Sequence, residues 1–485
     1  MQLLTGLLIT PLFGAILIAV LPARHDRMYR NVALATSAAA MMLSFYVLSV
    51  FNLQTSGLQL TEHINWNPRL GMAYDIGIDG ISLPMIVLAS MLSFIAVLAS
   101  SNIHDRPRGY YLLMLLLETA MLGVFMAQDW VLLYVFWELT LIPLFFLIDR
   151  WGGKQRHGAA LNFVLYTFGG SVFLLVAMLV LFDSLPFHSF SMRYMAEAAT
   201  TLSEHEQLLI FLGFLIGFGV KMPIFPIHGW LPVAHVEAPG PVSILLSGIL
   251  LKMGAYGLLR VTEMLPNAVI QMQSTLMVLA LVSLVYGGLL AWRQTDMKKM
   301  IAYSSVSHMG VVLLGIATLN ITGMTGAVMQ MTAHGLVAGA LFLLIGLLYE
   351  RSHTRDIRDF SSLVRTTPRF AFFTILAFIA AVGMPGTAGF IAELHTLIGG
   401  FQQWGWLILV LSLGIMISAA YAIRTIGRLF TGPSRDEMNT LTDLCNTEML
   451  AAGLLTTGTI ILGVFPAFLL QYITPSLASL SRLFS

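Results

Sequence analysis

Seven titratable residues lie inside segments that are otherwise apolar enough to cross a membrane. They are Glu118, Glu138, Lys221, Lys252, His308, His334 and Glu393. A charged side chain near the bilayer centre costs about 2.5–3.5 kcal/mol on insertion scales, so a chain keeps one where it meets an opposite charge or lines a wet path. Acids, lysines and histidines spread across the middle of a bilayer are typical of a path for protons.

Glu138 and Lys221 are the first candidate pair. Glu138 lies in the middle of VLLYVFWELTLIPLFFLID, and Lys221 lies in the apolar stretch 208–226, next to prolines, in FGVKMPIFPIHGWLP. A static ion pair would only fasten two helices together. Alternatively the pair is a switch: desolvation disfavours a charged amine and a nearby carboxylate favours it, so moving the acid by a few ångström would let the lysine release its proton.

Lys252, His308 and His334 are expected to form a central relay, since neutral imidazole both donates and accepts a proton. The alternatives are a lysine that reaches toward an interface and histidines that serve only as hydrogen-bonding struts. Glu393 lies beyond an interrupted segment, VGMPGTAGFIAELHTL, and is expected to exchange protons there rather than to cap a helix.

Other polar residues are weaker candidates. Glu118 is a possible member of the relay that could instead pair locally, and His228 is a possible member beside the prolines. Asp79, His235 and Glu237 are expected at the edges of loops, in gating or structural roles.

Composition sets the class of protein. Hydrophobic residues are 57% of the chain and charged residues 10%, whereas a soluble domain carries about 25% charged residues. The formal net charge of +1 argues against nucleic acid as a partner, and the single cysteine, Cys445, excludes an intrachain disulfide framework. Because the chain has no phosphate loop, dinucleotide fingerprint, cysteine cluster or HExxH pattern, we expect no redox cofactor and no metal on it.

Windows of about 20 apolar residues predict an all-α polytopic membrane protein with about 14 transmembrane helices. The predicted spans are 3–22, 30–51, 82–101, 111–127, 130–149, 159–183, 207–226, 240–263, 268–290, 297–318, 324–348, 370–400, 405–430 and 450–475. The first is expected to be a retained span rather than a cleaved signal. Segment 52–80 is mixed in character and is expected to pack on the surface.

Lysine and arginine are distributed unequally between alternate loops. One set of loops holds Arg24, Arg27, Arg30, Arg106, Arg108, Arg150, Lys154, Arg156, Arg293, Lys298, Lys299, Arg351, Arg355, Arg358, Arg365, Arg369, Arg424, Arg428 and Arg435. The opposite set holds only Arg69, Arg193, Arg260 and Arg482. This asymmetry places the first set on the cytoplasmic side. With an even number of spans, both termini are expected on the outer, periplasmic side.

The chain also contains an internal repeat. Residues 158–179 align with 326–347, and Val-Lys-Met-Pro at 220–223 aligns with Val-Gly-Met-Pro at 382–385. We therefore predict two inverted five-helix repeats, 111–263 and 268–430, each with one broken helix, near Lys221–Pro226 and near Met384–Glu393 respectively. Residues 1–110 would form three helices and an outer loop, and 431–485 a C-terminal helix. Paired broken helices point to an ion path, although prolines also merely kink transmembrane helices.

Four stretches carry a resemblance to a known family. They are YVFWELTLIPLFFLI, FGVKMPIFPIHGWLPVAHVEAPGPVSILLSGILLKMGAYGLLR, DMKKMIAYSSVSHMG and GMPGTAGFIAE. The chain resembles the antiporter-like, proton-pumping membrane subunits of respiratory complex I (NADH:quinone oxidoreductase), and more distantly subunits of Mrp-type cation/proton antiporters. Among the three sibling subunits, glutamate rather than lysine in the second broken helix is similar to the chain M kind, and Glu393 fits it.

The resemblance implies a proton-translocating subunit of a larger translocase in the bacterial inner membrane. By it, Glu138 and Lys221 correspond to the family's acid–lysine pair, Lys252, His308 and His334 to its relay, and Glu393 to the residue that exchanges protons with the outer side. FMN, iron–sulfur clusters and quinone would belong to other subunits, and sibling antiporter-like subunits would be neighbours. Three alternatives stay open: a sodium/proton antiporter subunit, the equivalent subunit of a ferredoxin:plastoquinone complex, and a membrane scaffold whose charges are only structural.

Overall fold

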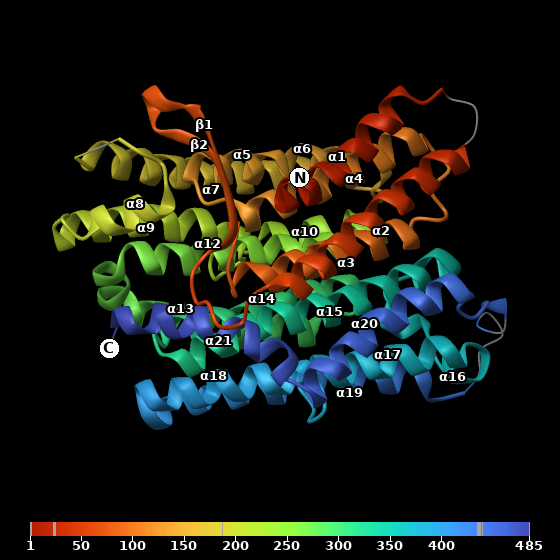
Figure 1. Cartoon of the computed structure of the whole chain (residues 1–485). Coiled ribbons are helices and arrows are strands. Elements are labelled where there is room, and N and C mark those ends of the chain that lie inside the picture. The colour runs from red at the N-terminus through yellow and green to blue at the C-terminus, as the bar shows by residue number, and fades with distance from the viewer. Residues whose placement is uncertain (1, 23–25, 187, 434–437, 439, 485) are drawn as a thin grey trace.

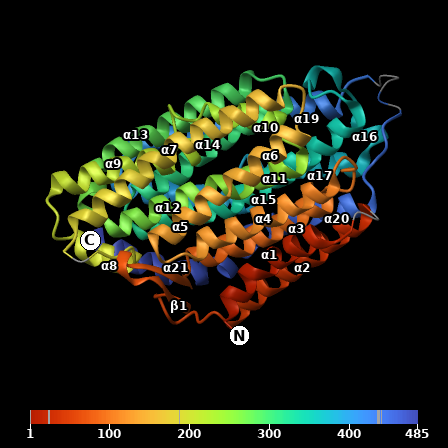
Figure 2. The same ribbon diagram turned by 90° about the horizontal axis from the view of Figure 1, so that it is seen from above.

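The fold is a bundle of helices whose axes run roughly parallel (Figure 1), and in the view from above α2 lies at one edge and α13 at the opposite edge (Figure 2). The structure is a computed structural model and describes residues 2–22, 26–186, 188–433, 438 and 440–484. The first half contains α1 Leu3–Val20, α2 Asp26–Val50, α3 Ser82–Ala99, α4 Pro107–Met126, α5 Trp130–Leu139, α6 Leu141–Trp151, α7 Arg156–Ser184, α8 Met192–Ala199, α9 Glu204–Lys221, α10 Trp230–Glu237, α11 Gly240–Leu245, η2 Leu246–Leu250 and α12 Leu251–Met264.

The second half of the chain is also helical. It contains α13 Pro266–Arg293, α14 Met297–Ala317, α15 Ile321–Ser352, η3 Ile357–Asp359, α16 Leu363–Thr366, α17 Pro368–Ala381, α18 Ala388–Trp404, η4 Gly405–Leu409, α19 Val410–Phe430, α20 Asn446–Val464, α21 Ala467–Ser481 and η6 Arg482–Phe484. Of the described residues, 12 helical segments are long and apolar enough to cross a membrane. The prediction of a mostly helical, multi-pass membrane protein is confirmed, while the count of 14 spans, the domain boundaries and the inverted repeat stay predictions.

Both predicted interruptions are present. Helix α9 ends at Lys221 and α10 begins at Trp230, and α17 ends at Ala381 while α18 begins at Ala388. The intervening backbone cannot continue either helix, because proline lacks an N–H and clashes with the preceding turn. Gly383 takes a φ of +74° at the second break, a conformation that glycine adopts without strain.

One sequence prediction is wrong in detail. Residues 450–475 are not one span, because α20 ends at Val464 and a new helix, α21, begins at Ala467, directly after Pro466. Segment 52–80 contains an antiparallel hairpin of β1 Gln59–Asn67 and β2 Met72–Ile78. The Glu62 carboxylate of β1 accepts the Leu4 N–H of α1 at 2.8 Å, and Gly80 N–H donates to Ser476 Oγ of α21 at 3.0 Å. The first helix, α1, and the last long helix, α21, therefore meet the same segment, 52–80.

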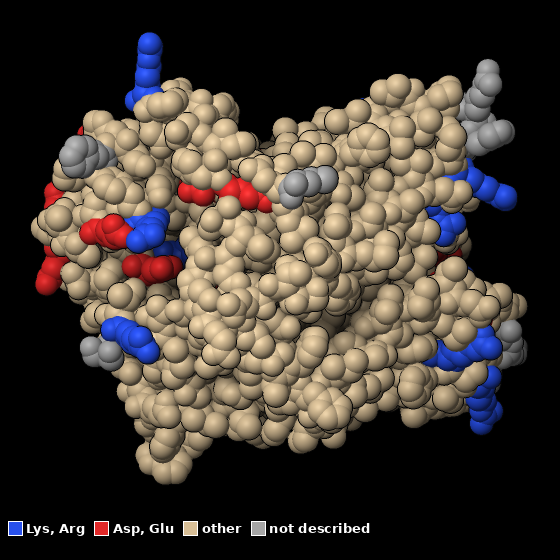
Figure 3. All heavy atoms as spheres, in the orientation of Figure 1, with Lys and Arg blue, Asp and Glu red and all other residues tan. Residues whose placement is uncertain are grey.

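The surface separates charge from apolar area. In Figure 3, lysine and arginine gather at the right-hand end, basic and acidic side chains mix at the left-hand end, and the band between them is nearly free of both. An apolar belt between two charged rims is the surface that a bilayer requires. Of the predicted basic set, Arg24 and Arg435 lie outside the described residues, as do the terminal Met1 and Ser485.

Helix α12 approaches the end of α9 at a glycine. A Cβ added to Gly254 would lie 2.6 Å from Phe218 O and 2.8 Å from Met222 N, both of them backbone atoms that cannot rotate away. This contact places the helix of Lys252 directly against the break that follows Lys221.

We expect Gly254→Ala to destabilise the protein by about 1–3 kcal/mol, because the added methyl group overpacks a rigid backbone contact. Thermal unfolding of the purified protein in detergent measures this effect. Gly453→Ala in α20, where an added Cβ meets nothing within 4 Å, is the matched control and should be neutral or slightly stabilising. Equal effects of the two changes would contradict the packing argument.

Candidate functional site

Four of the predicted residues form one continuous row across the bundle. Lys252 Nζ lies 2.6 Å from His334 Nδ1, and the His334 and His308 rings lie 5.4 Å apart between centroids. His308 Nδ1 in turn lies 3.9 Å from Glu393 Oε1. All four residues are buried, and they come from α12, α15, α14 and α18. The row therefore reaches from the first half of the chain to the second broken helix.

The start of the row depends on a local departure from α-helical geometry. The π-helical turn η2 directly precedes α12, and the Ser247 carbonyl within it accepts from Lys252 Nζ at 2.6 Å. Single π-turns inside helices occur frequently at functional sites because they free backbone groups. Ser247 Oγ also contacts Ser305 Oγ of α14 at 3.1 Å, which extends the polar surface beside the lysine.

The end of the row is shaped by the second break. A Cβ on Gly383 would lie 2.5 Å from Glu393 Oε2, so the carboxyl group packs directly against the interrupted backbone. Gln330 of α15 contributes an amide 3.2 Å from His308 Nδ1. Sequence reasoning missed Gln330, although its position four residues before His334 on the same helix face was a usable signal.

Lys221 and Glu138 lie near each other but do not form a direct ion pair in the described structure. The lysine Nζ donates to Thr140 Oγ1 at 2.9 Å and to Trp137 O at 3.4 Å, and it lies 3.9 Å from the centre of the Trp137 ring. Glu138 still interacts with it electrostatically, while Glu138 Oε1 is buried without a hydrogen-bond partner. This is the separated arrangement of the predicted pair.

A third helix irregularity, at Thr140, lies where the Thr140 hydroxyl accepts a hydrogen bond from Lys221. Helix α5 ends at Leu139 and α6 begins at Leu141, so the regular helix is interrupted at Thr140. Pro143 has no N–H, so it cannot donate to the Leu139 carbonyl as a residue in a regular helix would. Sequence reasoning missed both Thr140 and this interruption, although LTLIP in the quoted motif contained the proline that causes it.

The two weaker candidates stand outside this row. Glu118 is fully buried on α4 and neither carboxyl oxygen has a hydrogen-bond partner among the described residues, so the alternative of a local pairing finds no support there. His228 packs its ring against Phe225 and Tyr286 in the first break, and its Nδ1 has no partner there. Among the described residues, no hydrogen bond or ion pair joins either residue to Lys252 or Glu393.

His235 is more deeply placed than its predicted loop-edge position. It lies on α10, is completely buried, and stacks on Phe342 with ring centroids 4.4 Å apart. Both of its ring nitrogens lack a hydrogen-bond partner in the described structure, and Lys252 and Lys298 both act on it electrostatically. Sequence reasoning underrated this residue because HVEAPGP reads as a turn.

A cavity of about 260 Å³ opens near His235 at the basic end of the bundle. Its lining includes Glu237, Lys298, Glu350 and Arg355. Lys298, which the sequence placed in a loop, lies in the first turn of α14 and donates to Ala238 O at 2.8 Å. The cavity therefore reaches the segment of α10 that holds the buried His235, and its polar lining belongs to the basic end of the bundle.

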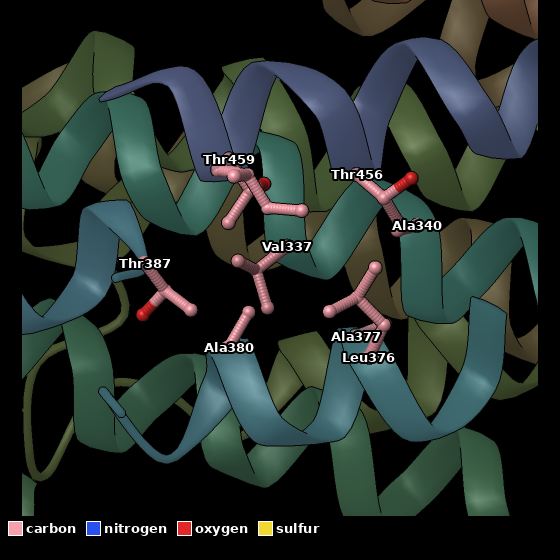
Figure 4. Close-up of a pocket in the computed structure, with 9 residues that line it drawn as sticks. Val337, Ala340, Leu376, Ala377, Ala380, Thr387, Thr456 and Thr459 are labelled. Atoms are coloured by element: carbon pink, nitrogen blue, oxygen red, sulfur yellow. The ribbon is translucent and has the colours of Figure 1, made fainter. Parts of the chain in front are cut away.

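A second, smaller cavity beside the second break carries no such chemistry. It measures about 10 Å³ and lies between α15, α17 and α20 (Figure 4). The hydroxyls of Thr387, Thr456 and Thr459 donate to carbonyls of their own segments at 2.7–2.9 Å. A space for about one water with apolar walls is not a path for ions.

Comparison with known proteins shows the family of this chain. Residues 127–418 match the family described as "NADH:quinone oxidoreductase/Mrp antiporter, TM". The chain belongs to this family. The matched region contains Glu138, Lys221, Lys252, His308, His334 and Glu393, so the whole candidate relay lies within the family's membrane domain.

Relatives in this family resemble the chain over nearly its full length. It is 39% identical to NADH-quinone oxidoreductase subunit M of Rhodobacter capsulatus, over 99% of this chain and 96% of that protein. It is 40% identical to NAD(P)H-quinone oxidoreductase chain 4 1 of Synechococcus elongatus, over 96% of this chain and 89% of that protein. The predicted resemblance to a subunit of the chain M kind is confirmed.

Solved structures of the family share the fold. A chain of respiratory complex I from Thermus thermophilus with bound NADH superimposes with a TM-score of 0.91 at 30% identity, and each chain is covered completely. The Mrp complex from Dietzia superimposes with a TM-score of 0.84 over 99% of this chain, and at 24% identity this likeness concerns the fold alone.

Thr140→Val tests the first-half site, because valine keeps the shape of threonine and removes the hydroxyl that accepts from Lys221. We expect proton transport by the complex to fall about tenfold, the effect of a barrier change of about 1.4 kcal/mol. Proton uptake into vesicles during quinone reduction measures it. Thr119→Val, whose hydroxyl donates only to Leu115 O of its own helix, is the control. Unchanged transport in Thr140→Val would show that this hydrogen bond has no functional role.

Proposed function

We propose that this chain moves protons outward across the membrane as a subunit of a quinone oxidoreductase of the complex I type, driven by redox chemistry in other subunits. The contacts from Lys252 through His334 and His308 to Glu393 carry this proposal, since they place four groups that are able to exchange protons next to one another. The close relatives named as subunits of quinone oxidoreductases support the same assignment.

In this mechanism, protons enter from the basic, cytoplasmic end. We infer that they pass from the cavity lined by Glu237 and Lys298 to His235, which directly precedes the lining residue Val236. The unpartnered ring nitrogens of His235 can accept and release a proton in turn. His235 hands the proton to the region of Lys252, with which it interacts electrostatically. The sequence of contacts then leads through His334 and His308 to Glu393 at the second break.

Glu138 and Lys221 act as the switch that times these transfers. When the carboxylate moves toward Lys221, it stabilises the protonated amine, and when it moves away, Thr140 and Trp137 are the remaining partners and the desolvated amine releases its proton toward Lys252. The half-buried position of Glu138 near a helix interruption supports this role, because an interrupted helix can shift without unfolding.

The setting of the subunit follows from the same proposal. The chain spans the bacterial inner membrane with its basic loops in the cytoplasm and both termini on the outer side. Sibling antiporter-like subunits and other membrane subunits are its partners, while FMN, iron–sulfur clusters and quinone belong to other subunits. The translocase activity therefore belongs to the assembled complex.

Purification separates this proposal from its alternatives. We expect the chain, isolated in a mild detergent, to bring flavin and iron–sulfur subunits with it and to reduce quinone with NADH. A particle without redox cofactors that exchanges sodium for protons would support the antiporter alternative. A particle that oxidises ferredoxin but not NADH would support the plastoquinone-type complex.

Glu138→Gln tests the switch and the scaffold alternative together. Glutamine keeps the size of the side chain and removes its charge, so we expect pumping to fall about tenfold or more, with assembly unchanged. The ratio of protons moved to quinone reduced, measured in proteoliposomes, reports the loss. Glu197→Gln on α8, an exposed acid paired with Arg193, is the control. Full pumping by Glu138→Gln in an assembled complex would mean that these charges are only structural.

A further inference from the structure

A large cavity opens at the end of the molecule that carries the β1–β2 hairpin. It measures about 700 Å³, and its charged lining residues are Asp79, Arg193, Glu197, Arg260 and Glu263. Arg193 is 83% exposed and pairs with Glu197 at the rim, whereas Arg260 and Asp79 are only 8% exposed and lie at the floor. The proposed function places this end on the outer side, so the cavity brings outer water deep into the first half.

The floor of the cavity is an ion pair with two parallel hydrogen bonds. Arg260 Nη1 and Nη2 donate to Asp79 Oδ2 and Oδ1, both at 2.8 Å. Burial alone would raise the pKa of Asp79, but the charge and hydrogen bonds of Arg260 outweigh it and hold this pKa below its ordinary value, so the carboxylate is charged at neutral pH. The Asp79 carboxylate also accepts hydrogen bonds from the backbone N–H groups of Ile81 and Ser82, and these bonds fix it at the start of α3.

A layer of aromatic side chains lies directly beneath this pair. The Arg260 guanidinium lies 4.8 Å from the centre of the Tyr256 ring, which is completely buried. Tyr256 packs edge-on against Phe125 with centroids 5.3 Å apart, and its hydroxyl donates to the Phe125 carbonyl at 3.2 Å. This hydrogen bond joins α12 to α4 and holds the Tyr256 ring between the two helices.

Lys252 is on the same helix face, but its amine points away from the cavity. Lys252, Tyr256 and Arg260 are spaced by four residues along α12, so Lys252 lies about 12 Å below Arg260 along the helix axis. Its Nζ donates to the carbonyl of Ser247, which precedes it in the chain, and contacts His334, so the amine points away from Tyr256 along the helix. In the described chain, no hydrogen bond joins Lys252 to Tyr256.

We propose that Asp79, Arg260 and Tyr256 form a seal that separates outer water from Lys252 and so prevents protons from returning through the first half. The inference rests on the proposed function, in which protons leave at Glu393. An open connection from the outer cavity to Lys252 would let them flow back down the gradient. The bidentate pair closes the cavity floor, and the Tyr256 ring supplies the apolar thickness beneath it.

The opposite interpretation is that Tyr256 is itself a step in a second outward path. The two ideas differ in what the hydroxyl does. A relay needs the Tyr256 O–H, whereas a seal needs only the ring. Tyr256→Phe keeps the ring and removes the hydroxyl, and Tyr256→Ala removes both.

The test uses the whole complex in proteoliposomes, with an imposed pH gradient and no redox substrate. We expect Tyr256→Ala and Arg260→Gln to raise passive proton leak about tenfold, as a barrier lowered by about 1.4 kcal/mol would, and to lower the ratio of protons moved to quinone reduced. Tyr256→Phe should leave both quantities at their wild-type values. Arg193→Gln, which changes an arginine at the rim of the same cavity, is the matched control and should also leave them unchanged.

Each outcome decides the question. Wild-type leak in both Tyr256→Ala and Arg260→Gln, with normal quinone reduction, overturns the seal. Loss of pumping in Tyr256→Phe without leak overturns it in favour of a relay. If Arg260→Gln does not assemble, Tyr256→Ala still measures the aromatic layer. Glu138→Gln loses pumping without leak if the proposed function holds, so failure of that function and failure of the seal give different results.

Discussion

The contact between Lys252 and His334 is the interaction on which the rest of the site depends. It is buried, it has no carboxylate partner in the described chain, and it joins α12 of the first half to α15 of the second. A protonated amine held only by an imidazole nitrogen and a carbonyl is expensive in a low-dielectric interior. The surrounding elements must therefore supply polar groups, and they do so through the π-turn at η2, the Ser247–Ser305 contact and the Gln330 amide.

Helix interruptions are the common device that puts polar groups where the bilayer supplies none. Breaks after Lys221 and before Glu393 are joined by a smaller one at Thr140, caused by Pro143. Each frees backbone groups, and each lies beside a titratable side chain of the proposed relay. Such breaks are tolerable because packed groups cover them. The Gly254 backbone of α12 lies against Phe218 near the first break, and the Glu393 carboxyl group lies against Gly383 in the second.

The two ends of the first half differ in a way that suits movement in one direction. At the basic end, a cavity is lined by the titratable residues Glu237, Lys298 and Glu350, whereas at the hairpin end a larger cavity stops at a bidentate ion pair and an aromatic layer. The two cavities therefore differ in the chemistry of their lining as well as in size. The proposed direction of transport rests on this contrast and on the proposed switch at Glu138.

Sequence alone was sufficient for the membrane class and the two broken helices, and it named the four residues that the structure brings together in the row. A charge in an apolar segment is conspicuous because burial without a function is costly, and Met-Pro in corresponding positions marks the breaks. The tertiary structure decided which of these charges meet. It separated Lys221 from direct contact with Glu138, left Glu118 without a partner, buried His235 and paired Asp79 with Arg260, 181 residues away. Contacts between distant segments depend on how helices pack against one another. The apolar pattern of one span does not tell which polar side chain of another span will face it.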